Sequence, residues 1–216
     1  MPGVEDRVAV LGRTGSGKTQ FAVWLLSNAN FDRMPWIVMN FKGDKLIDAI
    51  PGTFDLDINA RIPTAPGIYV TRPIVADKDD KEKLNEFFRR CWERENVGIY
   101  VDEGYMATNI KWFRACLTQG RSRHVPMIVL SQRPSWIDTF VWTEATYFAA
   151  FDLNREDVKI LAGKMLPGYR NAKLPPYWSI WHDVNRDSTF MLKPVPDRDT
   201  LLARFRARLP MRRKAI

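Results

Sequence analysis

The sequence has few cysteines, no long hydrophobic run, no internal repeat and no low-complexity tract. Its two cysteines, Cys91 and Cys116, lack metal-site spacing, and both fall in segments with helical patterning. We therefore expect reduced, buried thiols, as in a cytoplasmic protein. The longest apolar runs have only the length of a strand, and no signal peptide is visible, so we expect no membrane span.

Positive charge is what the sequence has in excess. Thirty-three lysines and arginines against 25 acidic residues give a net charge of +8 and a pI of about 9.6. This balance favours a polyanionic partner, either nucleic acid or an acidic membrane surface, although surplus basic residues also serve solubility alone. The length of 216 residues and the 45% hydrophobic content suit one α/β domain with a short appendage.

A glycine-rich motif follows the first apolar run. Residues 8–19 read VAVLGRTGSGKT and satisfy the phosphate-loop pattern G-x-x-x-x-G-K-[ST]. Its glycines let backbone N–H groups turn toward phosphates, and the following helix points its positive end at the anion. Lys18 is suited to reach the outer phosphates, and the Thr19 hydroxyl to ligate Mg²⁺. The predicted nucleotide-binding residues are Gly12, Arg13, Thr14, Gly15, Ser16, Gly17, Lys18, Thr19 and Gln20.

Strand-like and helix-like segments alternate through most of the chain. We expect strands at 7–11, 36–41, 67–71, 97–101, 127–130 and 146–151. We expect helices at 17–28, 77–95, 109–119 and 155–165. Residues 45–66, which contain three prolines, are expected to be irregular. The alternation predicts an α/β fold with a mainly parallel central sheet flanked by helices, whose ligands bind beyond the carboxyl ends of the strands.

The C-terminal part changes character. Residues 177–182 and 189–192 predict a small hairpin, and residues 197–209 predict a helix. We therefore divide the chain into a core of residues 1–170, with an insertion at about 42–76, and a tail of residues 171–216 packed on or extending from the core. Basic residues without acidic neighbours make the end of this tail either a DNA-phosphate contact or a solvated basic end. They are Arg204, Arg206, Arg208, Arg212, Arg213 and Lys214.

An acidic pair and a strand-terminal amide supply the other half of a candidate active site. Asp102 and Glu103 follow an apolar strand, as the magnesium-binding acid and the catalytic carboxylate do in phosphate-loop ATPases. Asp102 would then hold Mg²⁺ and Glu103 would polarise the attacking water, although Asp-Glu at a strand end is also compatible with an ordinary cap or turn. Gln132 ends a later strand and is suited to sensing the γ-phosphate.

Residues 120–134, GRSRHVPMIVLSQRP, resemble the signature of the FtsK/HerA superfamily of DNA-pumping ATPases. Together with the phosphate loop and the acidic pair, they match that superfamily's motifs in order over roughly residues 7–152. The resemblance implies a RecA-like P-loop NTPase core of the ASCE type, with an added strand between the two nucleotide-binding motifs. It carries the sensor role onto Gln132 and the arginine finger onto Arg121. Arg123 fits a structural ion pair or a DNA contact better than a finger.

Two further segments bear on the subfamily. Residues 69–73, YVTRP, and the compact size are similar to the genome-packaging ATPases of tailless, membrane-containing phages. Residues 41–44, FKGD, look like the superfamily's D-P-K-G element, but Asn40 and Phe41 stand where that element has Asp-Pro. The role of this element therefore stays open.

The resemblance predicts an ATP-driven double-stranded DNA translocase that packages a viral genome. Such a protein would use ATP and Mg²⁺, hydrolyse ATP at the interfaces of a hexameric or pentameric ring, and meet capsid or portal-vertex proteins. We expect it in the host cytoplasm or at the packaging vertex of the virion. Three alternatives stay open at this point. They are an assembly or secretion ATPase of the filamentous-phage type, a small-molecule kinase, and a nucleotide-dependent scaffold that does not hydrolyse ATP.

Overall fold

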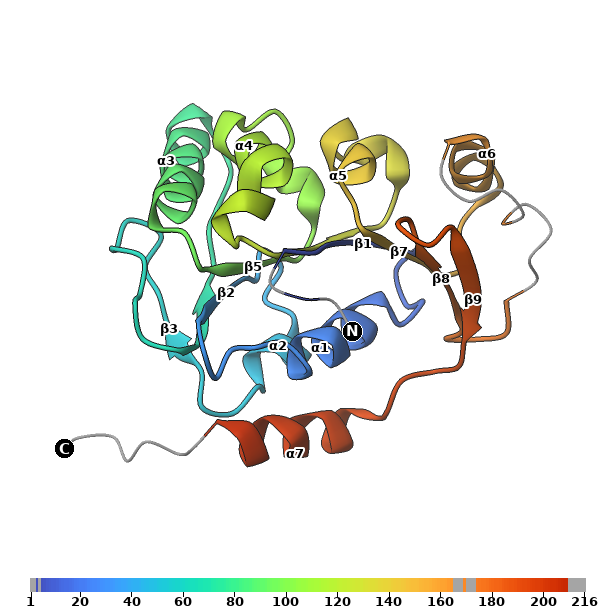
Figure 1. The fold of residues 1–216 in the computed structure, drawn as a ribbon, viewed down its shortest axis with the longest axis horizontal. Helices are drawn as coiled ribbons and strands as arrows, with labels where there is room; N and C mark the ends of the chain where they lie inside the picture. Colours follow the sequence, from blue (N-terminus) through green and yellow to red (C-terminus); the bar gives the residue numbers. More distant parts are fainter. Residues whose placement is uncertain (1–2, 4, 165–168, 170–173, 210–216) are drawn as a thin grey trace.

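The computed structural model describes residues 3, 5–164, 169 and 174–209, arranged in three layers (Figure 1). The strands are β1 (Arg7–Leu11), β2 (Pro35–Met39), β3 (Phe54–Asp55), β4 (Gly67–Thr71), β5 (Gly98–Val101), β6 (Met127–Ser131), β7 (Tyr147–Ala150), β8 (Ser179–Asp183) and β9 (Ser188–Leu192). The helices are α1 (Lys18–Ser27), α2 (Lys45–Asp48), α3 (Lys78–Arg94), α4 (Lys111–Gln119), α5 (Thr139–Thr143), α6 (Arg155–Lys164) and α7 (Arg198–Arg208). Helices α3, α4, α5 and α6 cover one face of the sheet, and α1, α2 and α7 lie on the other.

The described strands form one sheet in the order β3-β4-β2-β5-β6-β1-β7-β8-β9. All pairs from β3 to β7 are parallel, whereas β8 and β9 are antiparallel to their neighbours. Strand β6 separates β1 from β5, which confirms the added strand expected between the phosphate loop and the acidic pair. In the register, Leu11 lies beside Ser131, and Val101 lies beside Val129. The carboxyl ends of these three strands therefore meet at one edge.

The central strands are buried on both faces, as a parallel sheet covered by helices requires. All five residues of β1 are buried. Its alternate side chains enter two cores, because successive residues of a strand point to opposite faces. Ala9 and Leu11 join the core beneath α3 and α4, while Val8 and Val10 join the core beneath α1. Cys91 and Cys116 are free and buried in the first of these cores, as expected.

The expectation that residues 45–66 are irregular was wrong in two places. Helix α2 forms because the Asp44 side chain accepts hydrogen bonds from the backbone N–H groups of Leu46 and Ile47, which caps its first turn. Ile47 is fully buried and fixes the helix against the core. Strand β3 adds two residues in parallel to the outer side of β4. Elements this short lack the periodicity by which a sequence predicts them.

The expected C-terminal hairpin and helix are present and continue the core. Strand β8 pairs with β7, so the hairpin extends the central sheet. Helix α7 packs on α1 through Leu201, Leu202 and Phe205. The expected division near residue 170 falls on residues outside the described part of the chain. Among the described residues, none of the helices has the length and apolar character needed to cross a membrane.

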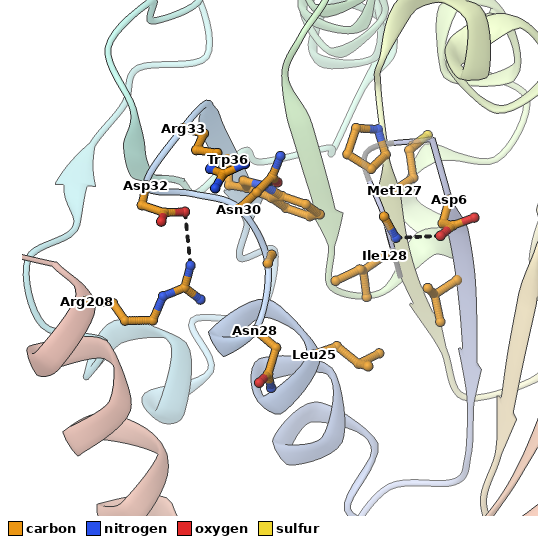
Figure 2. Close-up of a pocket in the computed structure, with 14 residues that line it drawn as sticks. Asp6, Leu25, Asn28, Asn30, Asp32, Arg33, Trp36, Met127, Ile128 and Arg208 are labelled. Atoms are coloured by element: carbon orange, nitrogen blue, oxygen red, sulfur yellow. Dashed lines mark hydrogen bonds and ion pairs between the residues drawn. The ribbon is translucent and has the colours of Figure 1, made fainter. Parts of the chain in front are cut away.

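Arg208 fastens the end of α7 to the end of α1. Its guanidinium donates a hydrogen bond to the Ser27 carbonyl at 2.7 Å. It also pairs with Asp32 at 3.0 Å (Figure 2). It also lies over the Phe31 ring, 4.2 Å from the centroid. A cavity of about 240 Å³ opens beside this contact, lined by residues such as Trp36, near the amino ends of β1, β2 and β6. It is therefore remote from the edge where the carboxyl ends of these strands meet.

Candidate active site

The phosphate loop connects β1 to α1 and has the backbone geometry that its sequence predicts. Gly15 and Gly17 adopt positive φ angles of 80° and 95°, which favour glycine. Gly12 has no room for a side chain, because a Cβ atom there would lie 2.4 Å from the Ser16 hydroxyl and 2.7 Å from the Phe151 Cβ. Helix α1 begins directly after Gly17 with no side-chain cap. Its first N–H groups are therefore available to an anion.

The loop is fastened to the two strands that flank β1. The N–H of Gly12 donates to the Ser131 carbonyl at 3.2 Å, and the N–H of Arg13 donates to the Asp152 carbonyl at 3.3 Å. The Arg13 guanidinium also pairs with the Asp152 carboxylate at 2.6 Å, although both side chains are largely exposed. Lys18, the first residue of α1, is 7% exposed. The loop is thus held in shape before any ligand binds.

Asp102 and Glu103 lie at the end of β5, and each is only 3% exposed. Burial, with added repulsion from Glu103 and Asp44, raises the pKa of Asp102 to about 7 against the opposing charges of Lys18 and Lys42. Glu103 itself has φ 61° and ψ 63°, a left-handed conformation that is uncommon outside glycine. Such backbone strain is concentrated at functional sites, where the surroundings hold it in place.

Hydrogen bonds connect the phosphate loop to the acidic pair. The Thr14 hydroxyl donates to the Oε1 atom of Gln132 at 3.0 Å, and the Gln132 Nε2 atom donates to the Oε1 atom of Glu103 at 3.0 Å. These three side chains come from the loop after β1, the end of β6 and the end of β5. The structure therefore brings together the predicted loop, sensor and catalytic carboxylate.

Lys42 completes this group and was not among the predicted site residues. Its ammonium lies 2.6 Å from the same Oε1 atom of Glu103. Although burial disfavours the charged ammonium, the hydrogen bond and the charge of Glu103 outweigh it and raise the pKa of Lys42. The sequence did contain a feature that could have identified Lys42, because this residue follows the buried strand β2 and belongs to the FKGD element. What the sequence did not show was that β2 neighbours β5.

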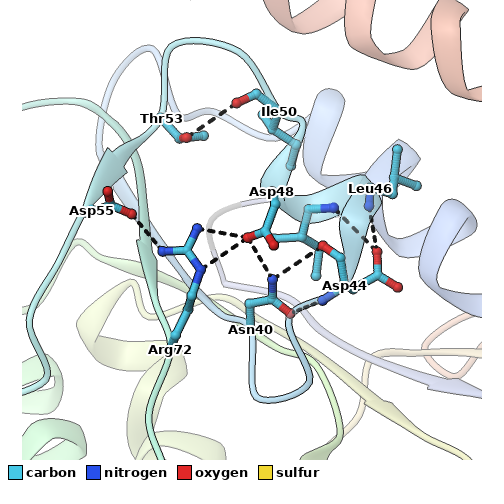
Figure 3. Close-up of polar contacts among 9 residues, drawn as sticks. Asn40, Asp44, Leu46, Asp48, Ile50, Thr53, Asp55 and Arg72 are labelled. Carbon is cyan, nitrogen blue, oxygen red and sulfur yellow. Dashed lines mark hydrogen bonds and ion pairs between the residues drawn. The ribbon is translucent and has the colours of Figure 1, made fainter.

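A polar network fixes the turn that carries Lys42 (Figure 3). The Oδ1 atom of Asn40 accepts from the Asp44 N–H at 2.8 Å, and its Nδ2 atom donates to the Asp44 carbonyl at 3.3 Å and to the Asp48 carboxylate at 3.0 Å. Arg72, just after β4, donates to Asp48 and to Asp55. An aspartate at position 40 has no donor for Asp48, so the asparagine suits this network.

The buried oxygen atoms of this site suit a magnesium ion. Asp102 Oδ1, Glu103 Oε2 and Ser16 Oγ are buried and have no hydrogen-bond partner. Across the described residues, no three His, Cys, Asp or Glu side chains gather as a metal-binding group. Mg²⁺ is typically held by one or two protein oxygens together with substrate phosphates and water. The unpaired Oδ1 atom of Asp102 fits this role, and the assignment of Mg²⁺ to Asp102 together with Thr19 stays a prediction.

Arg121 lies at the opposite edge of the sheet from the phosphate loop. It belongs to the 3₁₀ helix η2 (Gly120–Arg123), which precedes β6, whereas Gln132 follows β6. The Arg121 side chain is 65% exposed and contacts Glu5 at 3.4 Å. Arg121 is therefore not part of this subunit's own site, and its role as a finger stays a prediction about a neighbouring subunit.

The predicted nucleic-acid residues fall into three groups. Arg123 and Arg208 make internal contacts. Arg123 stacks 3.4 Å from the Trp92 ring centroid and pairs with Glu95 at 2.5 Å, and Arg208 holds α7 as described above. Arg204 and Arg206 are exposed on α7. The remaining three, Arg212, Arg213 and Lys214, lie outside the described residues.

Comparisons with known proteins place this site in context. No family model matches the chain. The DNA packaging ATPase P9 of Enterobacteria phage PRD1 is 42% identical, over 95% of this chain and 94% of that protein.

Among solved structures, the fold is similar to the genome packaging NTPase B204 from Sulfolobus turreted icosahedral virus 2 in complex with sulfate. The TM-score is 0.70 at 17% identity, over 91% of this chain and 100% of that one. It is also similar to EssC (ATPases 2 and 3) from Geobacillus thermodenitrificans, with a TM-score of 0.64 at 11% identity over 97% of this chain and 45% of that one. These structures share the mainly parallel sheet flanked by helices. The 42% identity across nearly the whole of both sequences shows that the chain belongs to the family of the DNA packaging ATPase P9.

Proposed function

We propose that this protein is the ATP-hydrolysing motor subunit that drives double-stranded DNA into a viral capsid. The observation that carries the proposal is the continuous connection from the phosphate loop through Thr14 and Gln132 to Glu103. It places a nucleotide-binding loop and a buried carboxylate in one site, in a chain that belongs to the family of a DNA packaging ATPase.

The residues divide the work of hydrolysis as follows. The backbone N–H groups at the start of α1 and the ammonium of Lys18 bind the phosphates. Mg²⁺, held by Thr19 and Asp102, would neutralise charge on the β- and γ-phosphates. Glu103 orients the attacking water and accepts its proton. Gln132, between Glu103 and Thr14, exchanges its contact with the loop for one with the γ-phosphate.

The proposed motor is a ring, with five or six subunits as the candidate stoichiometries. Arg121 points away from its own site, so it is suited to complete the site of the next subunit. The exposed Arg204 and Arg206 offer contacts to DNA phosphates, with the weak sequence preference and the salt sensitivity of such contacts. Capsid or vertex proteins are the proposed assembly partners, and the packaging vertex is the proposed location. A small-molecule kinase has the weaker case, because Glu103 beside Gln132 suits water as the acceptor.

ATPase measurements on the assembled protein test this proposal. We expect duplex DNA to stimulate turnover and the stimulation to fall as salt rises. We expect Glu103→Gln to lower kcat at least about 100-fold while ATP still binds, because the amide cannot accept the proton. Glu82→Gln, at an exposed position on α3, is the matched control and should leave turnover unchanged. Turnover that is indifferent to duplex DNA in the assembled ring would overturn the motor function, and full activity of Glu103→Gln would remove the proposed base.

A further inference from the structure

The sheet order fixes the direction in which a nucleotide lies across the site. Strands β5 and β6, which carry Glu103 and Gln132, lie on one side of β1, and β7, β8 and β9 lie on the other. If ATP binds as proposed above, its γ-phosphate faces Glu103 and Gln132. The ribose and the base then leave the phosphate loop toward β7 and the C-terminal hairpin, which the proposed chemistry does not use.

An exposed aromatic residue stands on that side, directly beside the loop. Tyr177 precedes β8, which is antiparallel to β7 and pairs its Ile180 with Ala150, so Tyr177 lies at the same edge of the sheet as the loop. A Cβ atom placed on Gly17 would lie 3.2 Å from the Cδ1 atom of the Tyr177 ring. The ring therefore abuts the residue at which α1 begins.

Tyr177 is held in place by its backbone while its ring stays open to solvent. The residue is 60% exposed, among the most exposed large hydrophobic residues of the described chain. Its φ of 65° belongs to the third position of a turn that follows Pro176 and is closed by a 3.1 Å hydrogen bond from the Trp178 N–H to the Pro175 carbonyl. The turn therefore presents an open aromatic ring directly beside the phosphate loop.

A cavity of about 250 Å³ lies between Tyr177 and the start of α1. Pro194 and Val195, which follow β9, form its other wall, and Gln20 is the polar side chain that lines it. The Gln20 amide donates to the Pro196 carbonyl at 2.8 Å, which fastens this wall to α1. Its size suits a base and not a whole nucleotide, since pockets for drug-sized ligands span about 300–1,000 Å³.

We infer that Tyr177 and the segment at residues 194–196 form the subsite for the base of the bound nucleotide, with the purine ring stacked on Tyr177. This inference rests on the proposed binding of ATP at the phosphate loop. The apolar wall and the open aromatic face bind a flat ring by stacking and exclusion of water. The segments that flank the C-terminal hairpin, which the superfamily motifs do not include, thereby line the nucleotide site.

The subsite is tested by comparing the affinities of two ligands, one with a nucleotide base and one without it. Titration calorimetry of the full chain with ADP and with inorganic pyrophosphate, both with Mg²⁺, measures the two affinities without hydrolysis. We expect Tyr177→Ala to weaken ADP binding about tenfold, the scale of one base stacked on an aromatic ring. Pyrophosphate affinity should stay within about twofold, because the phosphate loop is intact. Tyr177→Phe should bind ADP within about twofold of the original chain, because the ring is kept.

The control is Phe190→Ala, which removes an aromatic ring of similar exposure from β9 and should leave both affinities unchanged. Unchanged ADP affinity in Tyr177→Ala, or an equal loss for ADP and pyrophosphate, would overturn the subsite. The second outcome would show that Tyr177 only supports the loop. The motor function and the base subsite can fail independently. If only the motor function is wrong, turnover will not respond to DNA, but ADP binding will still depend on Tyr177.

Discussion

The ammonium of Lys42 and the amide of Gln132 both contact the same Oε1 atom of Glu103, at 2.6 and 3.0 Å, and leave Oε2 without a hydrogen-bond partner. Lys42 and Gln132 therefore fix the orientation of the carboxylate and of its buried, unpaired Oε2 atom. In the proposed mechanism Oε2 contacts the attacking water, and Lys42 acts through Glu103 as a positioning residue.

Replacing Lys42 with methionine should lower kcat about tenfold, a part of what a positioned base contributes. ADP affinity should stay within about twofold, because Lys42 is not part of the phosphate loop. Lys42→Arg should retain part of the activity, since a guanidinium still pairs with a carboxylate. Lys45→Met, at an exposed position on α2, is the matched control. Steady-state kinetics and calorimetry separate the two parameters, and an unchanged kcat in Lys42→Met would contradict the positioning role.

Asn40→Asp should destabilise the protein. The new carboxylate would face that of Asp48 across a contact that is now a 3.0 Å hydrogen bond, at a position only 1% exposed. We expect a loss of about 1–3 kcal/mol in the free energy of unfolding at neutral pH, the usual cost of a buried polar group left without its partner. Urea unfolding at pH 7 measures it, with Asn59→Asp at an exposed position as control. A variant as stable as the original chain would show that the network does not fix this turn.

Site residues that belong to contiguous sequence motifs could be predicted from the sequence. Lys42 and Tyr177, which pairing between distant strands brings to the site, could not. The phosphate loop and the acidic pair are contiguous motifs, so their spacing alone located Lys18, Asp102 and Glu103. Lys42 reaches Glu103 only because β2 lies beside β5, and Tyr177 reaches Gly17 only because β8 folds back beside β7. Pairing of distant strands depends on the packing of the whole sheet, which periodicity in one segment does not contain.

The raised pKa of Asp102 predicts a pH dependence of stability in the absence of Mg²⁺ and nucleotide. Its pKa is about 7 in the folded chain, above its ordinary 3.8, because of burial first and the charges of Glu103 and Asp44 second. Between these values the folded chain keeps a proton that the unfolded chain has lost. The contribution of this group to stability therefore falls as pH rises from about 4 through 7, and is level above that.

Asp102→Asn removes this titration and should flatten the dependence. At each pH the quantity to compare is the free energy of unfolding of the variant minus that of the original chain. This difference should be roughly 2–3 kcal/mol larger at pH 8 than at pH 5. Denaturant unfolding at the two pH values, with a chelator present, measures the difference. Comparing the two pH values cancels any constant effect of the substitution on packing. If the substitution changes the free energy of unfolding by the same amount at both pH values, Asp102 does not titrate in this range.

Arg121 and Gln132 lie at opposite ends of β6, and a strand of five residues spans roughly 16 Å. Arg121 is therefore remote from the site of its own chain, and as the proposed finger it would act on the site of a neighbouring subunit. Its exposed contact with Glu5 is weak enough to exchange. Arg121→Ala should assemble normally and lose at least about 1,000-fold in turnover. Glu103→Gln should also lose most of its turnover, at least about 100-fold. In an equal mixture assembled together, about a quarter of the interfaces would join an intact Glu103 to an intact Arg121 from the next subunit. The mixture should therefore recover a substantial part of the original ATPase activity, whereas two defects within one self-contained site would recover none.

A mixture that stays inactive although mass measurement shows mixed rings would exclude Arg121 as the residue supplied in trans. Full activity of Arg121→Ala would move that role to another arginine.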